Sequence, residues 1–430
     1  MMAEWFYRLR DMTVVFAGLM LVRYWLFLMI APWHSAKEEL RQIRIRKYYP
    51  ERIYNYAPLV SVIVPAWNEE VGILRTISSL LNNTYPHIEI VVVNDGSTDA
   101  SHKVVIDFLK QREHDGVSNK LLKYYYKENG GKGTALNHGI ERARGEIIVT
   151  MDADSIFHHQ AIERLVSYFR DPSISAAVGN VKIANNGTLV GQIQSLEYQF
   201  GFYFKRAHSV LNAEYIYGGA CAAFRRSETF DSLGLFDTLN KTEDIEMSLR
   251  TKYAGLKAVF AENVICYTEG ASTITGLVNQ RLRWKKGRLD TLVKYRQMFF
   301  SLKKHHNNWL CFFILPYSLL GELQLLFEPI GIALLLSYSI ISGDYLSLGL
   351  GIFFIFVTYF VVACFNFEKF NWRILLKFPF TWPLFYVTTW IEYMVLLRSI
   401  KMAVRGHEID WQRWERKGVD LKVVQSETKA

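Results

Sequence analysis

Two apolar regions frame the chain, and the first lies close to its N-terminal end. Residues 12–31 contain a single charged residue, Arg23, and a helix needs about 20 apolar residues to cross a bilayer. A secretory signal peptide is the competing interpretation, but the stretch is followed by bulky residues rather than by a small-residue cleavage site. We therefore expect an uncleaved transmembrane anchor within residues 1–33.

The second apolar region is longer. Trp309–Phe367 spans 59 residues with only three charged side chains, and we expect breaks near Glu322–Pro329 and near Ser342–Tyr345. A further apolar stretch covers Phe380–Leu397, after an amphipathic segment at Glu368–Lys377 that is typical of a membrane interface. The region predicts several transmembrane or interfacial helices whose number stays open. Carboxylates among them should face protein or water, because a charge in lipid is costly.

The middle of the chain has a different pattern, in which short apolar runs alternate with segments of helical periodicity. The runs are almost wholly apolar, which is typical of strands in a sheet that is covered on both faces. Strands that alternate with helices predict parallel βαβ units. The expected strands are 59–67, 88–95, 120–128 and 146–154, and the expected helices are 69–83, a segment from about Thr98, and 131–143.

Composition and charge agree with this division. Half of the 430 residues are hydrophobic and 21% are charged, which excludes a disordered chain. Basic segments at 37–52 and in the tail at 401–430 explain the net charge of +9, and such segments stay in the cytoplasm; we expect no nucleic-acid partner. The chain thus divides into the anchor, a cytoplasmic α/β domain at 34–305, membrane helices at 306–400 and a cytoplasmic tail.

Polar residues gather where the predicted strands end. They are Pro65, Asn68 and Glu69 after the first strand, Asp95 after the second, and Asp152 and Asp154 after the fourth. Ligands of such sheets bind outside the carboxyl ends of the strands. A lone Asp-Gly pair is usually only a turn, but three strand ends that carry carboxylates predict one shared site.

Asp152 and Asp154 are two residues apart at the end of a buried strand. Such a pair can direct two carboxylates at one hard cation, and Mg²⁺ or Mn²⁺ is usually held by one or two carboxylates and the phosphates of a substrate. Short acidic pairs are also common in loops, so the pair alone is weak evidence for a metal.

A glycine-rich segment at 129–133 precedes the helix expected at 131–143. It lacks the serine or threonine of a Walker P-loop, and it contains no G-x-G-x-x-G motif, so neither ATP nor a nicotinamide is indicated. Backbone N–H groups at a helix N-terminus attract anions, and Lys132 adds a positive charge there. An ordinary flexible loop is the alternative interpretation.

Two further motifs lie on expected helices. Residues 242–244 open one helix with acidic side chains, which could also simply complement the helix dipole. Gln280, Arg283 and Trp284 are spaced i, i+3, i+4 on another helix and share a face. Arg and Trp on one face are also typical of a helix at the lipid headgroups, and the two interpretations are compatible.

Together these motifs resemble those of the processive family-2 glycosyltransferases, the membrane synthases of cellulose, chitin, hyaluronan and poly-N-acetylglucosamine. The resemblance covers residues 57–300 and is greatest to the bacterial poly-β-1,6-N-acetylglucosamine synthases. It implies a GT-A fold, a Rossmann-like α/β domain that is inserted in the cytoplasm between transmembrane helices. The motifs are Pro65-x-x-Asn68-Glu69, Asp95-Gly96-Ser97, Lys132, Asp152-x-Asp154, Thr242-Glu243-Asp244 and Gln280-x-x-Arg283-Trp284, with the segments 92–99, 187–194 and 222–227 in support.

The resemblance also implies a role for each motif. Nucleotide binding falls to Pro65, Asn68, Glu69, Asp95, Lys132 and Asp152, and metal binding to Asp154 with Asp152. Catalysis falls to Thr242, Glu243 and Asp244, with Asp244 as the general base, and the diphosphate and acceptor to Gln280, Arg283, Trp284, Gly218 and Gly219. The implied cofactor is Mg²⁺ or Mn²⁺. The implied partners are a UDP-sugar donor, the growing polysaccharide and the lipid bilayer.

The expected function is inverting, processive transfer from a UDP-sugar into a β-linked polysaccharide that crosses the inner (plasma) membrane. The resemblance favours UDP-N-acetylglucosamine, while glucose and glucuronate donors stay open, as does a small accessory membrane subunit. Transfer of one sugar to a lipid carrier and a transporter or receptor with a nucleotide-binding domain are the alternatives. One departure from the family is Lys285-Lys286 after Trp284, which we expect to add positive charge beside the diphosphate.

Overall fold

The structure is a computed structural model. It describes residues 25–116, 121–185, 187–365, 372–405 and 418–419, and the single positions 5, 7, 8, 11, 15, 18 and 22. About half of the expected anchor at 12–31 and most of the tail at 401–430 lie outside the described residues, and so does the start of the amphipathic segment at 368–377.

One eight-stranded sheet, in the order β3-β2-β1-β4-β7-β6-β8-β5, forms the centre of the α/β region. Strands β3, β2, β1 and β4 pair in parallel, as the βαβ pattern predicts. The other half is mixed, because β7 is antiparallel to both β4 and β6, and β5 is antiparallel to β8. The strands are β1 Val60–Ala66, β2 Ile88–Asp95, β3 Leu122–Lys127, β4 Ile147–Thr150, β5 Ser155–Phe157, β6 Ala176–Ile183, β7 Ala222–Arg225 and β8 Ala258–Thr268.

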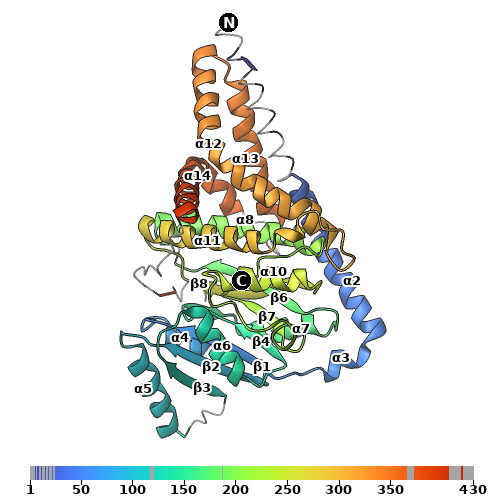
Figure 1. The fold of residues 1–430 in the computed structure, drawn as a ribbon, viewed down its shortest axis with the longest axis vertical. Helices are drawn as coiled ribbons and strands as arrows, with labels where there is room; N and C mark the ends of the chain where they lie inside the picture. The colour runs from blue at the N-terminus through green and yellow to red at the C-terminus, as the bar shows by residue number, and fades with distance from the viewer. Residues whose placement is uncertain are drawn as a thin grey trace.

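Helices cover both faces of the sheet (Figure 1), which explains why every residue of β1 and β2 is buried. One core lies under α4, α5 and α7, and the other under α6, α9 and α10. Both use the apolar stripes that the periodicity predicts. The helices are α4 Ile73–Leu81, α5 Ser101–His114, α6 Lys132–Arg142, α7 Ala161–Phe169, α9 Phe230–Leu233 and α10 Glu243–Tyr253.

Two long helices, α8 (Leu189–Val210) and α11 (Ile274–Lys294), lie between the sheet and the C-terminal apolar helices (Figure 1). Each is capped by a threonine, Thr188 or Thr273, whose hydroxyl accepts a hydrogen bond from a backbone N–H of the first turn. Helices α2 (Trp33–Tyr48) and α3 (Pro50–Asn55) descend beside the sheet (Figure 1). The site is therefore bounded by the sheet edge on one side and α11 on the other.

The C-terminal part is helical, and α12 and α13 extend away from the sheet (Figure 1). Within the described ranges, one helical stretch, Leu310–Ser342, is long and apolar enough to cross a membrane. The elements here are η1 Arg296–Met298, η2 Leu310–Ile314, α12 Leu315–Ser342, α13 Leu346–Phe365 and α14 Trp372–Arg405.

The break expected near Glu322–Pro329 is wrong, because α12 continues through Pro329. A proline inside a helix removes one backbone hydrogen bond and kinks the helix without having to end it. The break expected at Ser342–Tyr345 is confirmed, since α12 ends there and α13 begins at Leu346. The carboxylate of Glu322 is buried against protein, as the cost of a charge in lipid requires.

Candidate active site

Asn68 ties the carboxyl ends of β1 and β2 together. Its backbone has φ +56°, a left-handed conformation that few non-glycine residues adopt. Its side-chain oxygen accepts hydrogen bonds from the backbone N–H groups of Thr98 (2.7 Å) and Asp99 (3.2 Å), and its own N–H donates to the Ser97 hydroxyl (2.9 Å). Asn68 thereby holds the turn after Asp95 against the end of β1.

The neighbouring residues of the first motif have backbone roles as well. The N–H of Glu69 donates to the hydroxyl of Ser101 (2.8 Å) at the start of α5. Pro65 is buried within β1, in register with Val93 of β2. The motif therefore shapes this edge of the sheet, whichever ligand it binds.

Asp95 organises the glycine-rich loop. Its carboxylate accepts hydrogen bonds from the backbone N–H groups of Gly130 (3.1 Å) and Gly131 (2.8 Å) and from the ammonium of Lys127 (2.5 Å). The loop is thus not the ordinary flexible segment of the alternative interpretation. Because Gly131 directly precedes Lys132, Asp95 also fixes where the Lys132 side chain begins.

Lys132, Asp152 and Asp244 meet at Gly219. The Lys132 ammonium lies 2.6 Å from Oδ1 of Asp152 and 3.4 Å from Oε1 of Glu243. A Cβ atom placed on Gly219 would lie 2.5 Å from the Lys132 ammonium and 3.6 Å from a carboxylate oxygen of Asp152 and of Asp244. The structure therefore brings the end of β4, the start of α6, the start of α10 and the 217–220 loop to one point.

The close charges act on one another's protonation. Burial would lower the pKa of Lys132, but the carboxylates of Asp152, Glu243 and Asp244 outweigh it and raise that pKa above its usual value, so the lysine stays cationic. Burial raises the pKa of Glu243, Lys132 opposes this, and the charge of Asp244 adds to it. The pKa of Glu243 therefore lies above its usual value.

Asp154 lies next to this group but has its own partners. One of its oxygens accepts hydrogen bonds from the hydroxyls of Ser155 and Thr268, each at 3.3 Å. Among the residues that the structure describes, no group of three or more His, Cys, Asp or Glu side chains could hold a metal by itself. A cation here would draw ligands from the two aspartates and from a bound phosphate group, which is common for Mg²⁺ and Mn²⁺.

Helix α11 carries the motif Gln280-x-x-Arg283-Trp284 and lies beside Glu243. Arg283 lies close enough to Glu243 that its guanidinium lowers the pKa of that carboxyl, against the larger effect of burial. Gln280 is 6% exposed, and its Oε1 has no hydrogen-bond partner among the described residues. The Arg281 guanidinium lies over the Trp284 ring, 4.9 Å from its centre. A buried polar atom without a hydrogen-bond partner is rare in native proteins, and a bound ligand or ion is one explanation for it.

Helix α11 touches the acidic motif directly. A Cβ atom on Gly287 would overlap the Thr242 side chain, so only glycine permits this close approach. The Asn240 amide donates to the Thr291 hydroxyl at 2.9 Å. The helix that carries Arg283 and the helix that carries Asp244 are therefore packed as one unit.

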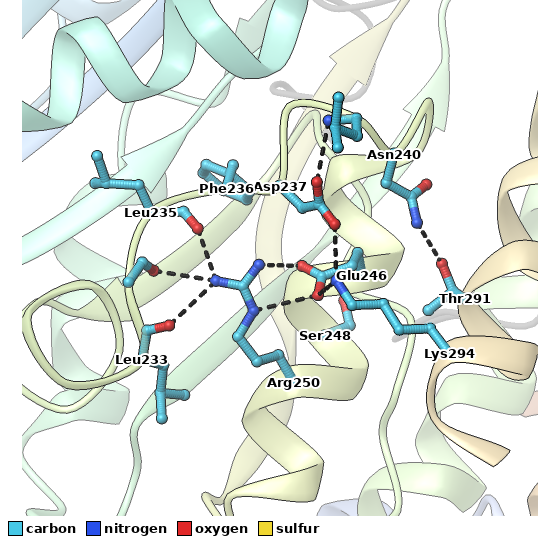
Figure 2. Close-up of polar contacts among 12 residues, drawn as sticks. Leu233, Leu235, Phe236, Asp237, Asn240, Glu246, Ser248, Arg250, Thr291 and Lys294 are labelled. Atoms are coloured by element: carbon cyan, nitrogen blue, oxygen red, sulfur yellow. Dashed lines mark hydrogen bonds and ion pairs between the residues drawn. The ribbon is translucent and has the colours of Figure 1, made fainter.

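The loop before the acidic motif is held by a buried carboxylate (Figure 2). Glu246 is fully buried and accepts hydrogen bonds from Arg250, from Lys294 (2.7 Å) and from the Tyr295 hydroxyl (2.7 Å). Arg250 also donates to the backbone oxygens of Leu233, Gly234 and Leu235. Lys294 of α11 in addition pairs with Asp237 at 2.7 Å. These contacts fix the entry into α10 and hence the position of Asp244.

Several residues of this arrangement were missed by sequence reasoning. Lys127 offered no motif, since it ends a strand with a surface-like pattern. Tyr198 of α8 lies near Asp152, Asp154 and Arg281, and burial raises its pKa to about 12. Glu246 was overlooked because an acidic residue in the first turn of a helix is easily explained by the helix dipole alone.

The chain resembles known glycosyltransferases in sequence. A model of glycosyl transferase family 2 matches residues 61–229, and a model of glycosyl transferase family group 2 matches residues 147–397. The chain is 31% identical over 237 residues to a poly-beta-1,6-N-acetyl-D-glucosamine synthase of Staphylococcus epidermidis (55% of this chain, 56% of that protein). It is 30% identical over 247 residues to the synthase of the same name from Staphylococcus aureus strain COL (57% of each). The chain thus matches somewhat more than half the length of these curated relatives.

A solved structure with a similar fold is the mannosyltransferase PcManGT from Pyrobaculum calidifontis, in complex with GDP-Man and Mn²⁺. It superimposes with a TM-score of 0.56 and 19% identity over 89% of this chain and 100% of that chain. At this identity the likeness concerns the fold alone. With a family model matching more than half of its residues, the chain belongs to glycosyltransferase family 2, as its motifs predict, and its mixed α/β domain has the Rossmann-like GT-A fold.

Proposed function

We propose that this protein is an inverting, metal-dependent, processive glycosyltransferase that polymerises a UDP-sugar into a β-linked polysaccharide and passes the polymer across the membrane. UDP-N-acetylglucosamine is the proposed donor, because curated relatives at 30–31% identity are named as synthases of its polymer. The observation that carries the proposal is the convergence of Lys132, Asp152 and Asp244 on Gly219. Such a group suits a reaction in which an acceptor hydroxyl loses a proton while a diphosphate leaves.

Asp244 is the proposed general base. It stands in the first turn of α10, and one of its carboxylate oxygens lies 3.6 Å from the position that a Cβ atom on Gly219 would take. A carboxylate there can take the proton of the acceptor hydroxyl, which typically contributes about 10²–10⁴-fold to the rate. Attack on the face opposite the leaving group inverts the anomeric carbon.

The leaving diphosphate is assigned to Lys132, Gln280 and Arg283. Arginine binds phosphate oxygens through two parallel N–H groups, and a lysine adds a point charge. Asp152 and Asp154 would hold Mg²⁺ or Mn²⁺, which when bound supplies further positive charge to the diphosphate. These residues suit a divalent cation, since carboxylates outnumber cationic side chains around Gly219. Trp284 offers an aromatic face to an acceptor sugar.

The arrangement of the helices supports export. Helix α11 lies between α10 and helices α12 to α14 (Figure 1), and Leu310–Ser342 has the length and composition of a membrane span. We place the domain at 34–305 in the cytoplasm, below helices of 306–400 in the plasma membrane, with 1–33 as an additional anchor. A polymer made over Gly219 would then lie at the membrane side of the domain.

The test is a UDP-release assay on the purified full chain. UDP-N-acetylglucosamine, UDP-glucose, UDP-glucuronate and UDP-galactose are compared, each with Mg²⁺, with Mn²⁺ and with EDTA. We expect release from UDP-N-acetylglucosamine that EDTA abolishes and that Asp244→Asn lowers at least 100-fold. No release from any donor would overturn the proposal, and release that is indifferent to EDTA would overturn the metal role of Asp152 and Asp154.

Product length tests processivity separately. Gel filtration or mass spectrometry of the product is expected to show chains of many sugars at low conversion, because a processive enzyme keeps its acceptor. Products of one added sugar, on a lipid or on a short acceptor, would instead identify a non-processive transferase. The linkage can be read from the same product by specific glycosidases.

A further inference from the structure

The sequence predicts that Lys285 adds positive charge beside the diphosphate, but in the structure Lys285 pairs with carboxylates of two other helices. It is 8% exposed, and its ammonium lies 2.8 Å from a carboxylate oxygen of Glu322 and 2.9 Å from one of Glu392. Glu322 belongs to α12 and Glu392 to α14. Its neighbour Lys286 turns to Asp290 in the next turn of α11 instead. The two lysines that follow the tryptophan therefore have different tasks.

Lys285 is part of a larger set of ion pairs along one side of α11. Arg281 pairs with Glu197 of α8 and lies 3.5 Å from Glu392, and Arg288 pairs with Glu322. Three cationic residues of one helix thus meet three carboxylates from three other helices. We call this set the α11 seam, and its members are Arg281, Lys285, Arg288, Glu197, Glu322 and Glu392.

The seam and Gly287 contact different neighbours of α11, and the seam meets the ligand motif where the Arg281 guanidinium lies over the Trp284 ring. Arg281, Lys285 and Arg288 are spaced i, i+4, i+7 and share one side. Gln280, Trp284 and Gly287 follow the same spacing one position earlier in each turn, and Gly287 contacts Thr242 on α10. Helix α11 is therefore joined to α8, α12 and α14 through the seam, and it contacts the start of α10 through Gly287.

The ion pairs of the seam fix the position of α11 as well as holding it to its neighbours. Taking a charge out of water is costly, and a buried pair recovers the cost only when its geometry is good. A shift of α11 along α12 by one residue would leave Lys285 without its carboxylates. An apolar contact would tolerate such a shift far better, so the seam defines one position of α11 relative to α12 and α14.

We propose that Glu322 and Glu392 are positioning residues for the active site. By holding Lys285, Arg281 and Arg288, they set where α11 places Gln280 and Arg283 against the donor diphosphate. The role of the apolar helices would then extend beyond a membrane anchor, since two of them fix a part of the catalytic centre. This inference rests on the proposed function, because it assigns the diphosphate to α11. A displacement of about 1 Å at reacting groups can cost about 100-fold in rate.

The experiment compares matched variants of the full chain in one detergent or nanodisc preparation. Glu322→Gln and Glu392→Gln each leave cationic side chains unbalanced, Lys285→Met leaves carboxylates unbalanced, and Lys285→Met with Glu322→Gln removes one charge of each sign. Lys286→Gln is the control, because it alters the adjacent lysine, whose partner Asp290 is exposed. The readouts are UDP release against donor concentration, binding of UDP with Mn²⁺ by calorimetry, and the melting temperature.

We expect Glu322→Gln and Glu392→Gln to lower kcat at least tenfold and to weaken binding of UDP with Mn²⁺ at least fivefold, at unchanged binding stoichiometry. The double variant should lose less than the product of the two single losses, because it restores charge balance. Glu392→Asp, which keeps the charge, should recover part of the loss. The control should stay within twofold of the unaltered chain in every readout.

Two results would overturn the inference. One is that folded Glu322→Gln and Glu392→Gln bind UDP with Mn²⁺ and turn over within twofold of the unaltered chain, whatever their melting temperatures. The other is that Lys286→Gln loses as much as they do. If Glu322→Gln does not fold, Lys285→Arg and Glu392→Asp decide by the same readouts. If the unaltered chain binds UDP but releases none from any sugar donor, the proposed function fails while the binding comparison still judges the seam.

Discussion

The group of charges over Gly219 and the α11 seam are built from the same residue types but in different proportions. Around Gly219, the three carboxylates of Asp152, Glu243 and Asp244 lie near two cationic residues, Lys132 and, on α11, Arg283. In the seam, three carboxylates meet three cationic side chains. One set of charges is unbalanced, and the other is complete.

The difference separates a site from a joint. A complete set of buried charges gains nothing from a further ion, since each charge already has its partner. An acidic excess at the edge of a sheet leaves negative charge that a divalent cation can neutralise, and the cation can in turn attract a diphosphate. Charge balance therefore favours the cluster over Gly219, rather than the α11 seam, as the proposed donor site.

The largest effect is expected at the base. Asp244→Asn keeps the shape of the side chain but removes its ability to accept a proton, so kcat should fall by about 10²–10⁴-fold. Binding of UDP with Mn²⁺ should change far less, because the diphosphate is assigned to other residues. Asp290→Asn is the control, since that carboxylate pairs with Lys286 on the outside of α11. Equal turnover of Asp244→Asn and the unaltered chain would remove Asp244 from the chemistry.

Gly219→Ala tests whether the convergence itself is needed. The added methyl group would lie 2.5 Å from the Lys132 ammonium, so the lysine must move away from Asp152. We expect kcat/KM for the donor to fall at least tenfold, with little change in the melting temperature. Gly201→Ala, where nothing lies within 4 Å of the new Cβ, should leave activity within twofold. Full activity of Gly219→Ala would show that the space over Gly219 is not where the reactants meet.

Glu89 extends the comparison to the opposite end of β2, where a complete set surrounds one carboxylate. Burial alone would raise the pKa of Glu89, but hydrogen bonds from Lys123, Ser61 and Arg144 lower it to about 2. Because the pKa of Glu89 in the folded protein lies below the usual 4.5, these hydrogen bonds stabilise the fold above about pH 4.5. The stabilisation is lost as the pH falls towards 2.

Glu89→Gln should therefore lower the free energy of unfolding near pH 7 by up to about 3 kcal/mol, following about 1.4 kcal/mol for each pKa unit. The measurement is the melting temperature of both proteins from pH 7 to pH 3, and their difference should shrink as the pH falls. The exposed Glu39→Gln serves as the control. A difference that grows on acidification would contradict the assignment, and UDP release at pH 7 and low temperature should be unaffected.

Much of the sheet could be predicted because its strands are local signals. The run Val60–Ala66 is apolar except for Ser61, and the observed strand lies within the predicted range by one residue at each end. The antiparallel half could not be predicted in this way. Strand β7 has four residues and β5 three, and their partners are far away in sequence, so no local periodicity reveals the pairing.

The candidate site divides along the same line. Motifs at strand ends could be located because the carboxyl edge of a parallel sheet collects ligand-binding residues. Of these, Asp152 lies close to Lys132 and Asp244, which come from the starts of two helices. The partners of Lys285 were not found, because Glu322 and Glu392 lie 37 and 107 positions further along the chain. A charged residue in a motif reads as a ligand contact until the structure shows an opposite charge beside it.

The smallest expected effect concerns a contact from the far end of the chain. Val419 is 4% exposed and packs with Ile156, Ala184 and Tyr267, and its carbonyl accepts a hydrogen bond from Arg75 (2.9 Å). Ile156 follows Asp154 by two residues, so this segment supports Asp154, the proposed metal ligand, rather than Lys132. Val419→Ala should raise the Mn²⁺ concentration for half-maximal UDP release about threefold and leave kcat within twofold.

The control for this contact is Leu302→Ala, because Leu302 is equally apolar but 87% exposed. A loss of kcat without a change in Mn²⁺ dependence would mean that Val419 acts on the base rather than on Asp154. A response equal to that of Leu302→Ala would show that this part of the tail contributes nothing to the site. The expected result would divide the active site into a half supported by the tail and a half supported by α11. Thr242, two residues before Asp244, packs against Gly287 of α11, whereas Asp154 accepts a hydrogen bond from Thr268 of β8, whose neighbour Glu269 accepts one from the backbone of Gly418.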